Sequence, residues 1–101
     1  VYVYMNNVDD TLRFEIRIYP EEIQRVREKY PGYTFEKEFE DGGINFDVFS
    51  KKESSGDYTY IMYFYYGKEK YIVIGRNDED KIQNIVIAYK NVVLSHEGNQ
   101  Q

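Results

Sequence analysis

Few side chains in this chain of 101 residues are suited to catalysis. His96 is the only histidine, and there is no cysteine to act as a nucleophile, a thiolate ligand or half of a disulfide. A general base needs a positioned neighbour in a defined pocket, whereas His96 lies in a polar stretch. We therefore expect no catalytic, cofactor-binding or metal-binding residues and no enzyme activity.

Carboxylates gather in one predicted β-hairpin, formed by residues 33–40 and 44–50. We place its turn at residues 41–42, because an Asp-Gly pair tolerates the positive φ that a two-residue turn requires. With this turn Phe39 lies opposite Ile44, and the apolar side chains of the two strands share one face. Four carboxylates then share the other face: Glu36, Glu38, Glu40 and Asp47.

This acidic face is a candidate binding site for a basic partner. In the same register Glu36 lies directly across from Asp47, and like charges opposed across two strands are destabilising. A surface that costs stability can be retained because a partner neutralises it. The alternative is that Arg13 and Arg17, on another strand, lie beside the hairpin and neutralise its carboxylates.

The aromatic run at residues 58–66 holds five of the twelve tyrosines. It is apolar on both faces of any strand it forms, which is typical of a central position in a sheet. The alternation of a strand places Ile61, Tyr63 and Tyr65 on one face and the other large side chains of the run on the opposite face. Tyrosine is enriched at protein interfaces, so Tyr63 and Tyr65 are candidates for partner contact. The alternative is that the whole run packs in the core.

Composition bears on the class of partner. The net charge is −5, from 18 acidic and 13 basic residues. Nucleic-acid binders carry a basic surface that neutralises phosphates, so we expect no nucleic-acid partner and a protein partner that is basic or neutral. No apolar run approaches the ~20 residues of a membrane-spanning helix, and no signal peptide is recognisable. The compartment stays unassigned, and a homo-oligomer stays open. Because the chain starts at Val1 inside an apparent strand, we expect a fragment of a longer or processed chain.

The remaining segments predict the elements that position these side chains. Residues 1–5 and 11–19 read as strands, the second with strict alternation of apolar and charged residues. Residues 20–30 predict a short helix that begins at a proline and ends before Pro31. The aromatic strand turns at residues 67–70, which pairs Tyr66 with Tyr71 in a returning strand.

The last segment predicts a second helix at about residues 78–94. Its apolar residues recur at helical spacing, and Asn77 suits the position of the N-cap. Residues 95–101 are expected to form a disordered tail. The whole chain, residues 1–101, thus predicts one small α+β domain. It has a mainly antiparallel sheet of about six strands, a short helix at about 20–30 and a C-terminal amphipathic helix.

Three functions are consistent with this reading. The leading hypothesis is a non-catalytic protein-binding module, such as an inhibitor, immunity-type or adaptor domain, that uses the acidic hairpin face and exposed tyrosines. The second is a ligand-binding or sensory domain with a pocket between sheet and C-terminal helix, lined by Tyr63, Tyr65 and Tyr89. The third is a carboxylate-dependent enzyme of unassigned reaction, which needs two carboxylates converging in a cleft.

Overall fold

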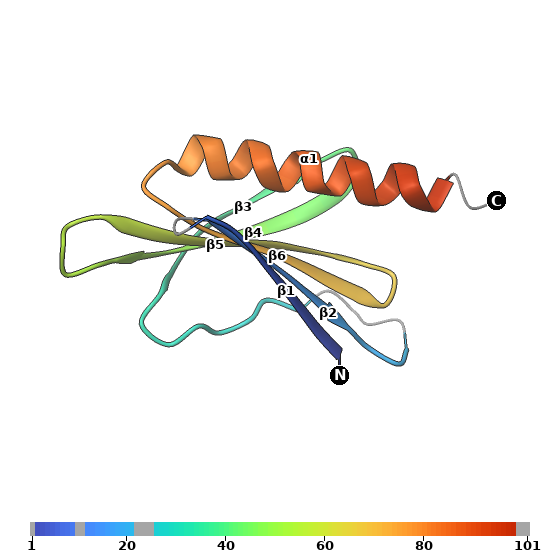
Figure 1. The fold of residues 1–101 in the computed structure, drawn as a ribbon, viewed down its shortest axis with the longest axis horizontal. Helices are drawn as coiled ribbons and strands as arrows, with labels where there is room; N and C mark the ends of the chain where they lie inside the picture. Colours follow the sequence, from blue (N-terminus) through green and yellow to red (C-terminus); the bar gives the residue numbers. More distant parts are fainter. Residues whose placement is uncertain (1, 10–11, 22–25, 99–101) are drawn as a thin grey trace.

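The computed structural model describes residues 2–9, 12–21 and 26–98 and shows an antiparallel sheet with one helix across a face (Figure 1). The strands follow the order β1-β2-β6-β5-β4-β3, and each neighbouring pair is antiparallel. This confirms the predicted α+β class with a mainly antiparallel sheet and a C-terminal helix. The elements are β1 (Tyr2–Asp9), β2 (Leu12–Ile18), β3 (Thr34–Asp41), β4 (Ile44–Lys52), β5 (Tyr58–Tyr66), β6 (Glu69–Arg76) and α1 (Glu79–Gly98).

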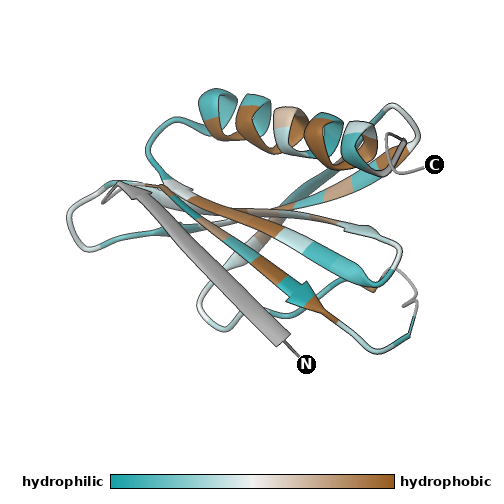
Figure 2. Ribbon diagram, turned by 45° about the vertical axis from the view of Figure 1, so that its right-hand side comes forward, coloured by the Kyte–Doolittle hydropathy of each residue, from teal (hydrophilic) through white to brown (hydrophobic). Residues whose placement is uncertain are grey.

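The sheet has an apolar cluster on each face, and apolar residues recur along α1 and the central strands (Figure 2). The cluster under α1 contains the buried residues Phe46, Val48, Met62, Phe64, Val73, Ile82 and Val86. The cluster on the opposite face contains Phe49, Ile61, Tyr63 and Ile72. The predicted alternation of the aromatic strand β5 is therefore confirmed, because Met62 and Phe64 lie under the helix while Ile61 and Tyr63 face away from it.

The register predicted for the β3–β4 hairpin is wrong by two residues. Asp41 pairs with Ile44, so the turn consists of Gly42 and Gly43, and Phe39 lies opposite Phe46 instead of Ile44. Both turn residues have positive φ, 60° and 82°. Two successive positive φ values are free of steric cost only for glycine, which favours the Gly-Gly turn over an Asp-Gly turn. A shift of two residues keeps each side chain on its predicted face.

One extra residue in β3 reverses that alternation at its start. The regular pairing with β4 is interrupted between Phe35 and Lys37, so Glu36 forms a β-bulge. As a result the Phe39 ring stacks on Phe46 beneath α1, with 4.6 Å between ring centroids. The Phe35 ring instead contacts Phe49 on the opposite face, at 5.4 Å.

The register predicted for the β5–β6 hairpin is also wrong by two residues. Tyr66 pairs with Glu69 rather than with Tyr71, and the turn is the two-residue Gly67–Lys68. Gly67 has a φ of 61°, and a glycine at the first turn position matches the twist of the flanking strands. Lys70, predicted to lie in the turn, therefore belongs to β6.

The C-terminal helix is longer than predicted and starts with a different cap. Asp78 caps it, because its Oδ1 atom accepts a hydrogen bond from the N–H of Lys81 at 3.0 Å. Asn77 precedes the cap with a φ of 73°. Residues 95–98, predicted to be disordered, continue the helix to Gly98, since no helix-breaking residue comes earlier. Val92 is one of the apolar residues of this helix, yet it is 65% exposed.

The short helix predicted at residues 20–30 is not seen. Pro20, Glu21 and residues 26–30 are not helical, and residues 22–25 lie outside the described part of the chain. The reason is tertiary: backbone groups of residues 26–30 that would bond within a helix bond instead to tyrosine hydroxyls of β5. Contacts with the rest of the fold here override the local helix signal.

Candidate functional site

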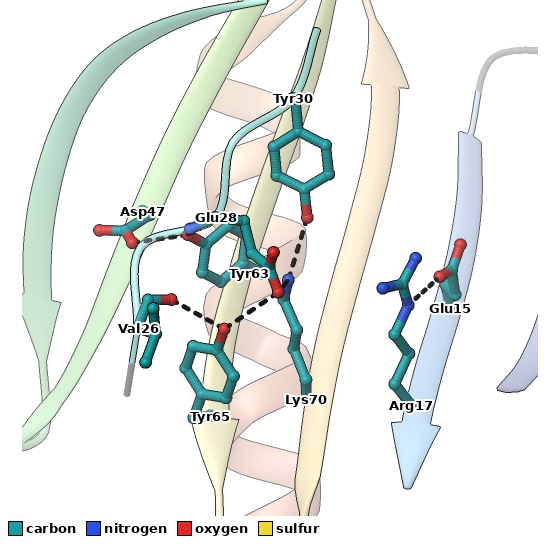
Figure 3. A network of polar contacts seen from close by, with 9 residues as sticks. All are labelled: Glu15, Arg17, Val26, Glu28, Tyr30, Asp47, Tyr63, Tyr65 and Lys70. Atoms are coloured by element: carbon teal, nitrogen blue, oxygen red, sulfur yellow. Dashed lines mark hydrogen bonds and ion pairs between the residues drawn. The ribbon is translucent and has the colours of Figure 1, made fainter. Parts of the chain in front are cut away.

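The irregular residues 26–30, called the strap below, lie on the face of the sheet opposite α1 (Figure 1). The site is built around Lys70 in β6, the strand next to β5. Its side chain has an exposed fraction of 0%. Its Nζ atom lies 2.8 Å from Oε1 of Glu28 and 3.1 Å from the hydroxyl of Tyr30, so the strap supplies both polar partners (Figure 3).

Three aromatic rings surround the same ammonium group. Nζ of Lys70 lies 4.2 Å from the ring centroid of Tyr63, and the centroids of Tyr30 and Tyr65 are 5.4 and 5.6 Å away. Aromatic rings attract a cation at such distances, and more strongly where water is excluded. The sheet supplies two of these rings and the strap supplies the third.

Tyrosine hydroxyls fasten the backbone of the strap to the sheet. The hydroxyl of Tyr63 accepts a hydrogen bond from the N–H of Glu28 and donates one to Oδ2 of Asp47, each at 2.8 Å. The hydroxyl of Tyr65 donates to the carbonyl oxygen of Val26 at 2.8 Å (Figure 3). The strap, although irregular, is therefore held at two backbone positions as well as through Glu28 and Tyr30.

Burial shapes the protonation of these groups. It lowers the pKa of Lys70, although the hydrogen bond to Glu28 opposes the shift. The hydrogen bond from Lys70 lowers the pKa of Glu28. Both pKa values are lowered, which disfavours the charged form of Lys70 and favours the charged form of Glu28. The charged forms respond differently because Lys70 is fully buried while the Glu28 side chain is 36% exposed, so desolvation falls mainly on the ammonium. Burial also raises the pKa values of Tyr30, Tyr63 and Tyr65, so their hydroxyls stay protonated to a higher pH than that of an exposed tyrosine.

The neighbouring strap residue Arg27 turns toward the β3–β4 hairpin. Its guanidinium carbon lies 3.8 Å from the ring centroid of Phe35. Its Nη2 atom is 3.9 Å from Oε1 of Glu38, and its Nε atom is 3.9 Å from Oδ1 of Asp47. Arg27 thus joins the strap to the acidic hairpin.

The structure brings most of the predicted site residues onto one face. Asp47, Tyr63 and Tyr65 belong to the network around Lys70, and Glu38 borders it through Arg27. Register places Glu40 on the same face as Glu38. Asp47 and Tyr63 are buried, with exposed fractions of 0% and 1%, so neither forms an outer surface. Tyr65 is partly buried.

Glu36 does not lie on this face, and the predicted positions of the charged side chains relative to one another are therefore wrong. The bulge turns Glu36 to the α1 side of the sheet, where it accepts a hydrogen bond from the hydroxyl of Ser50. Glu38, not Glu36, lies opposite Asp47. The proposed neutralisers Arg13 and Arg17 are on β2, and three strands separate β2 from β3. Arg17 forms an ion pair with Glu15 on its own strand, at 2.8 Å, and Arg27 takes the role near the hairpin that was expected of Arg13 and Arg17.

Two members of the network were missed from the sequence, Lys70 and Glu28. Lys70 was assigned to a turn and Glu28 to a helix. The sequence did offer a signal for Lys70. A two-residue turn at Gly67–Lys68, in place of the predicted turn at residues 67–70, puts this lysine in a strand opposite Tyr65. No signal in the sequence indicates that Glu28 lies near Tyr63 and Lys70, which are 35 and 42 positions away.

The three tyrosines of the predicted ligand pocket do not lie together. Tyr63 and Tyr65 face the strap, whereas Tyr89 packs on the α1 side, with its ring centroid 5.3 Å from that of Tyr71. Buried apolar side chains occupy the interface between α1 and the sheet. Within residues 2–9, 12–21 and 26–98, no group of three or more His, Cys, Asp or Glu side chains is arranged to hold a metal ion.

Comparison of the chain with protein-family models, with curated proteins and with solved structures gives no match. In the described part of the chain, no helix is long and apolar enough to cross a membrane. With the acidic net charge of −5, nothing in these residues indicates a nucleic-acid partner.

Proposed function

We propose that the chain is a non-catalytic protein-binding module, of the inhibitor, immunity-type or adaptor kind. Its binding surface would be the strap together with the acidic hairpin. The observation that carries this proposal is the attachment of the strap: Tyr63, Tyr65 and Lys70 hold its inner side. Its outer residues Val26 and Arg27 stay exposed, Val26 to 61%.

A loop held in this way suits recognition. Binding residues commonly lie on loops that a rigid scaffold positions. A loop that is already ordered loses less conformational entropy when a partner docks, so more of the contact energy appears as affinity. The hydrogen bonds from β5 and β6 therefore support a role for the strap in contact with another molecule.

A contribution to the stability of the fold does not by itself explain why the chain has a buried polar network around Lys70. An ion pair in the interior loses hydration, and replacing it with apolar side chains of similar volume is often neutral or stabilising. Lys70 lies on a sheet face where Ile72 and Tyr63 already pack. An apolar residue at position 70 would extend that cluster, but it would not fix the position of Glu28.

The exposed side chains have the composition of a contact surface. We call the strap surface the exposed or partly exposed side chains of Val26, Arg27, Phe35, Glu38 and Glu40. Arginine and aromatic residues are enriched in interfaces and carry much of their binding energy. Here the Arg27 guanidinium is stacked on Phe35, which positions it. The carboxylates of Glu38 and Glu40 favour a basic or neutral partner.

Affinity capture from the native host, followed by mass spectrometry, tests the proposal with matched variants. Val26→Glu places a charge on the strap surface, and Val92→Glu makes the same change on α1 at a similar exposed fraction, 61% against 65%. We expect Val26→Glu to reduce capture of a specific partner about tenfold or more, with Val92→Glu behaving as the unmodified chain. Recovery of no specific partner, or equal capture by both variants, would contradict the proposal.

A further inference from the structure

Three basic side chains, called the basic cluster below, gather on the face of the sheet that carries the strap. Lys51 in β4 and Arg76 in β6 both pair with Thr59 of β5, one on each side of it. Arg13 in β2 pairs with Ile74, which packs on this face two residues before Arg76. Diagonal neighbours in an antiparallel pair lie roughly 7–8 Å apart, within reach of long side chains. The guanidinium groups of Arg13 and Arg76 can therefore approach one point.

Tyr33, which follows the strap, lies beside the basic cluster. Nζ of Lys51 is 5.7 Å from the centroid of its ring. Burial and the charge of Glu53 raise the pKa of its hydroxyl. The charges of Arg13 and Arg76 oppose that shift, so both guanidinium groups act on this one oxygen. Within the described residues the hydroxyl has no hydrogen-bond partner, and it is free to donate to a ligand.

The basic cluster has no counter-ion within residues 2–9, 12–21 and 26–98. No carboxylate of these residues forms an ion pair with any of its three members. Nε of Arg13 is buried there without a hydrogen-bond partner. Glu53 accepts a hydrogen bond from Thr59 at 3.1 Å, which leaves the guanidinium groups uncompensated. Like charges held together and a cation partly removed from water both cost free energy, and a bound anion offsets both costs.

We propose that Arg13, Arg76 and the hydroxyl of Tyr33 bind an oxyanion, the group carried by a phosphate or a carboxylate. Arginine suits this ligand because its planar guanidinium donates two parallel N–H groups to two oxygens. Since Nε of Arg13 is covered, its terminal nitrogens supply the donors. Lys51 adds a positive charge without touching the anion. The site goes beyond the proposed function, because it uses no residue of the strap surface.

Titration with inorganic phosphate and, separately, with acetate tests the site. The readout is the NMR shift of the Thr59, Ile74 and Arg76 amides, and sodium chloride at the same ionic strength is the control for screening. We expect saturable shifts with at least one of the two oxyanions, and the one that binds more tightly identifies the class of ligand. No saturable shift with either oxyanion, or the same shifts with chloride, would overturn the proposal.

Matched variants that each remove one arginine charge locate the site. We expect Arg13→Gln and Arg76→Gln to weaken binding about tenfold or more, because each loses charge-assisted hydrogen bonds. The control is Arg17→Gln. Arg17 lies on the same face of β2, four residues and roughly 13 Å from Arg13, which exceeds the Debye length of about 8 Å in physiological salt. This control should therefore bind as the unmodified chain does.

The exposure of Arg76 keeps the test decisive if Arg13→Gln fails to fold, since an exposed side chain contributes little to the core. Equal effects of Arg76→Gln and Arg17→Gln would show general attraction of anions in place of a site, and would overturn the proposal. The capture experiment with Val26→Glu and Val92→Glu decides the proposed function separately.

Discussion

The Nζ atom of Lys70 lies 2.8 Å from Oε1 of Glu28, a residue 42 positions earlier in the chain. The two partners are unequally exposed, because the Lys70 side chain has an exposed fraction of 0% and that of Glu28 has 36%. Water can therefore reach one member of the pair and not the other. The two members should respond differently to the loss of their partner.

Removing Glu28 is expected to cost more than removing Lys70. Glu28→Ala leaves a buried ammonium without a counter-charge, and we expect the free energy of unfolding to fall by about 2–4 kcal/mol. Lys70→Met leaves a carboxylate that water can reach, and the expected loss is about 1–2 kcal/mol. Urea unfolding of the two single variants and the double variant measures both losses and their coupling. Equal losses, or the reverse order, would show that exposure does not govern this pair.

Alkaline pH is expected to destabilise the fold through its buried tyrosines. Burial raises the pKa of five of them in the folded state: Tyr30, Tyr33, Tyr60, Tyr63 and Tyr65. The unfolded chain releases these protons near pH 10 while the folded chain retains them, so the stabilisation is present below pH ~10 and decreases above it. Lys70 acts in the opposite direction, because its pKa is lowered in the folded state.

Tyrosinate absorbance and urea unfolding at increasing pH check this dependence. The net effect should be a loss of stability above pH ~10, since five tyrosines oppose one lysine. A group of the twelve tyrosines should titrate only when the chain unfolds. Tyr65→Phe should reduce the alkaline loss. Titration of all tyrosines before unfolding would disprove the expectation.

The two turn glycines of the β3–β4 hairpin are expected to differ in their tolerance of alanine. A Cβ atom on Gly42 would lie 2.9 Å from Nζ of Lys90, whereas a Cβ on Gly43 meets nothing within 4 Å. Both positions have positive φ, so each alanine costs about 1–2 kcal/mol in backbone strain. Gly42→Ala should cost about 1 kcal/mol more, because it displaces Lys90 from Asp41, its partner at 2.7 Å.

Thermal or urea unfolding of the two variants measures this difference. The control is the same pair in a Lys90→Ala background, where nothing remains to be displaced and the two costs should become equal. A difference that persists in that background would place its cause in the turn itself.

Gly75 is expected to be required where α1 crosses β6. A Cβ atom there would lie 2.8 Å from two side-chain carbons of Ile82. Gly75→Ala should lower the free energy of unfolding by about 1–3 kcal/mol through overpacking. A double-mutant cycle with Ile82→Ala tests the cause, because the cost of the alanine should fall when the opposing side chain is shortened. Additive losses would contradict it.

The sequence predicts on which face of the sheet a side chain lies better than it predicts the register between neighbouring strands. Alternation assigned Met62 and Tyr63 to the correct faces, although the predicted pairing of β5 with β6 was wrong by two residues. The reason is that side-chain direction repeats every two residues, so an error of two leaves the faces unchanged. Turn residues fixed the actual register, and glycine at positions 42, 43 and 67 was the decisive feature.

The strap could not be predicted from local sequence. Residues 20–30 carry ordinary helix signals, and these were overridden by hydrogen bonds to Tyr63 and Tyr65, far along the chain. The bulge at Glu36 was also missed, since an extra residue in a strand has no local signature here. These two features explain why Asp47, Tyr63 and Tyr65 were named as candidates on two separate surfaces without Lys70 and Glu28, and why Glu36 was placed on the acidic face.

The bulge has a consequence for which changes in the chain the fold tolerates. Glu36 shifts the alternation of β3 by one position, so the side chain of Phe35 is directed to the strap side. Many side chains could occupy position 36, because what matters is that the extra residue is present. Deleting it would direct Phe35 toward α1 and remove the ring on which the Arg27 guanidinium of the strap lies. The contact between Phe35 and Arg27 therefore depends on the number of residues in β3, and an insertion or deletion there is a more severe change than a substitution.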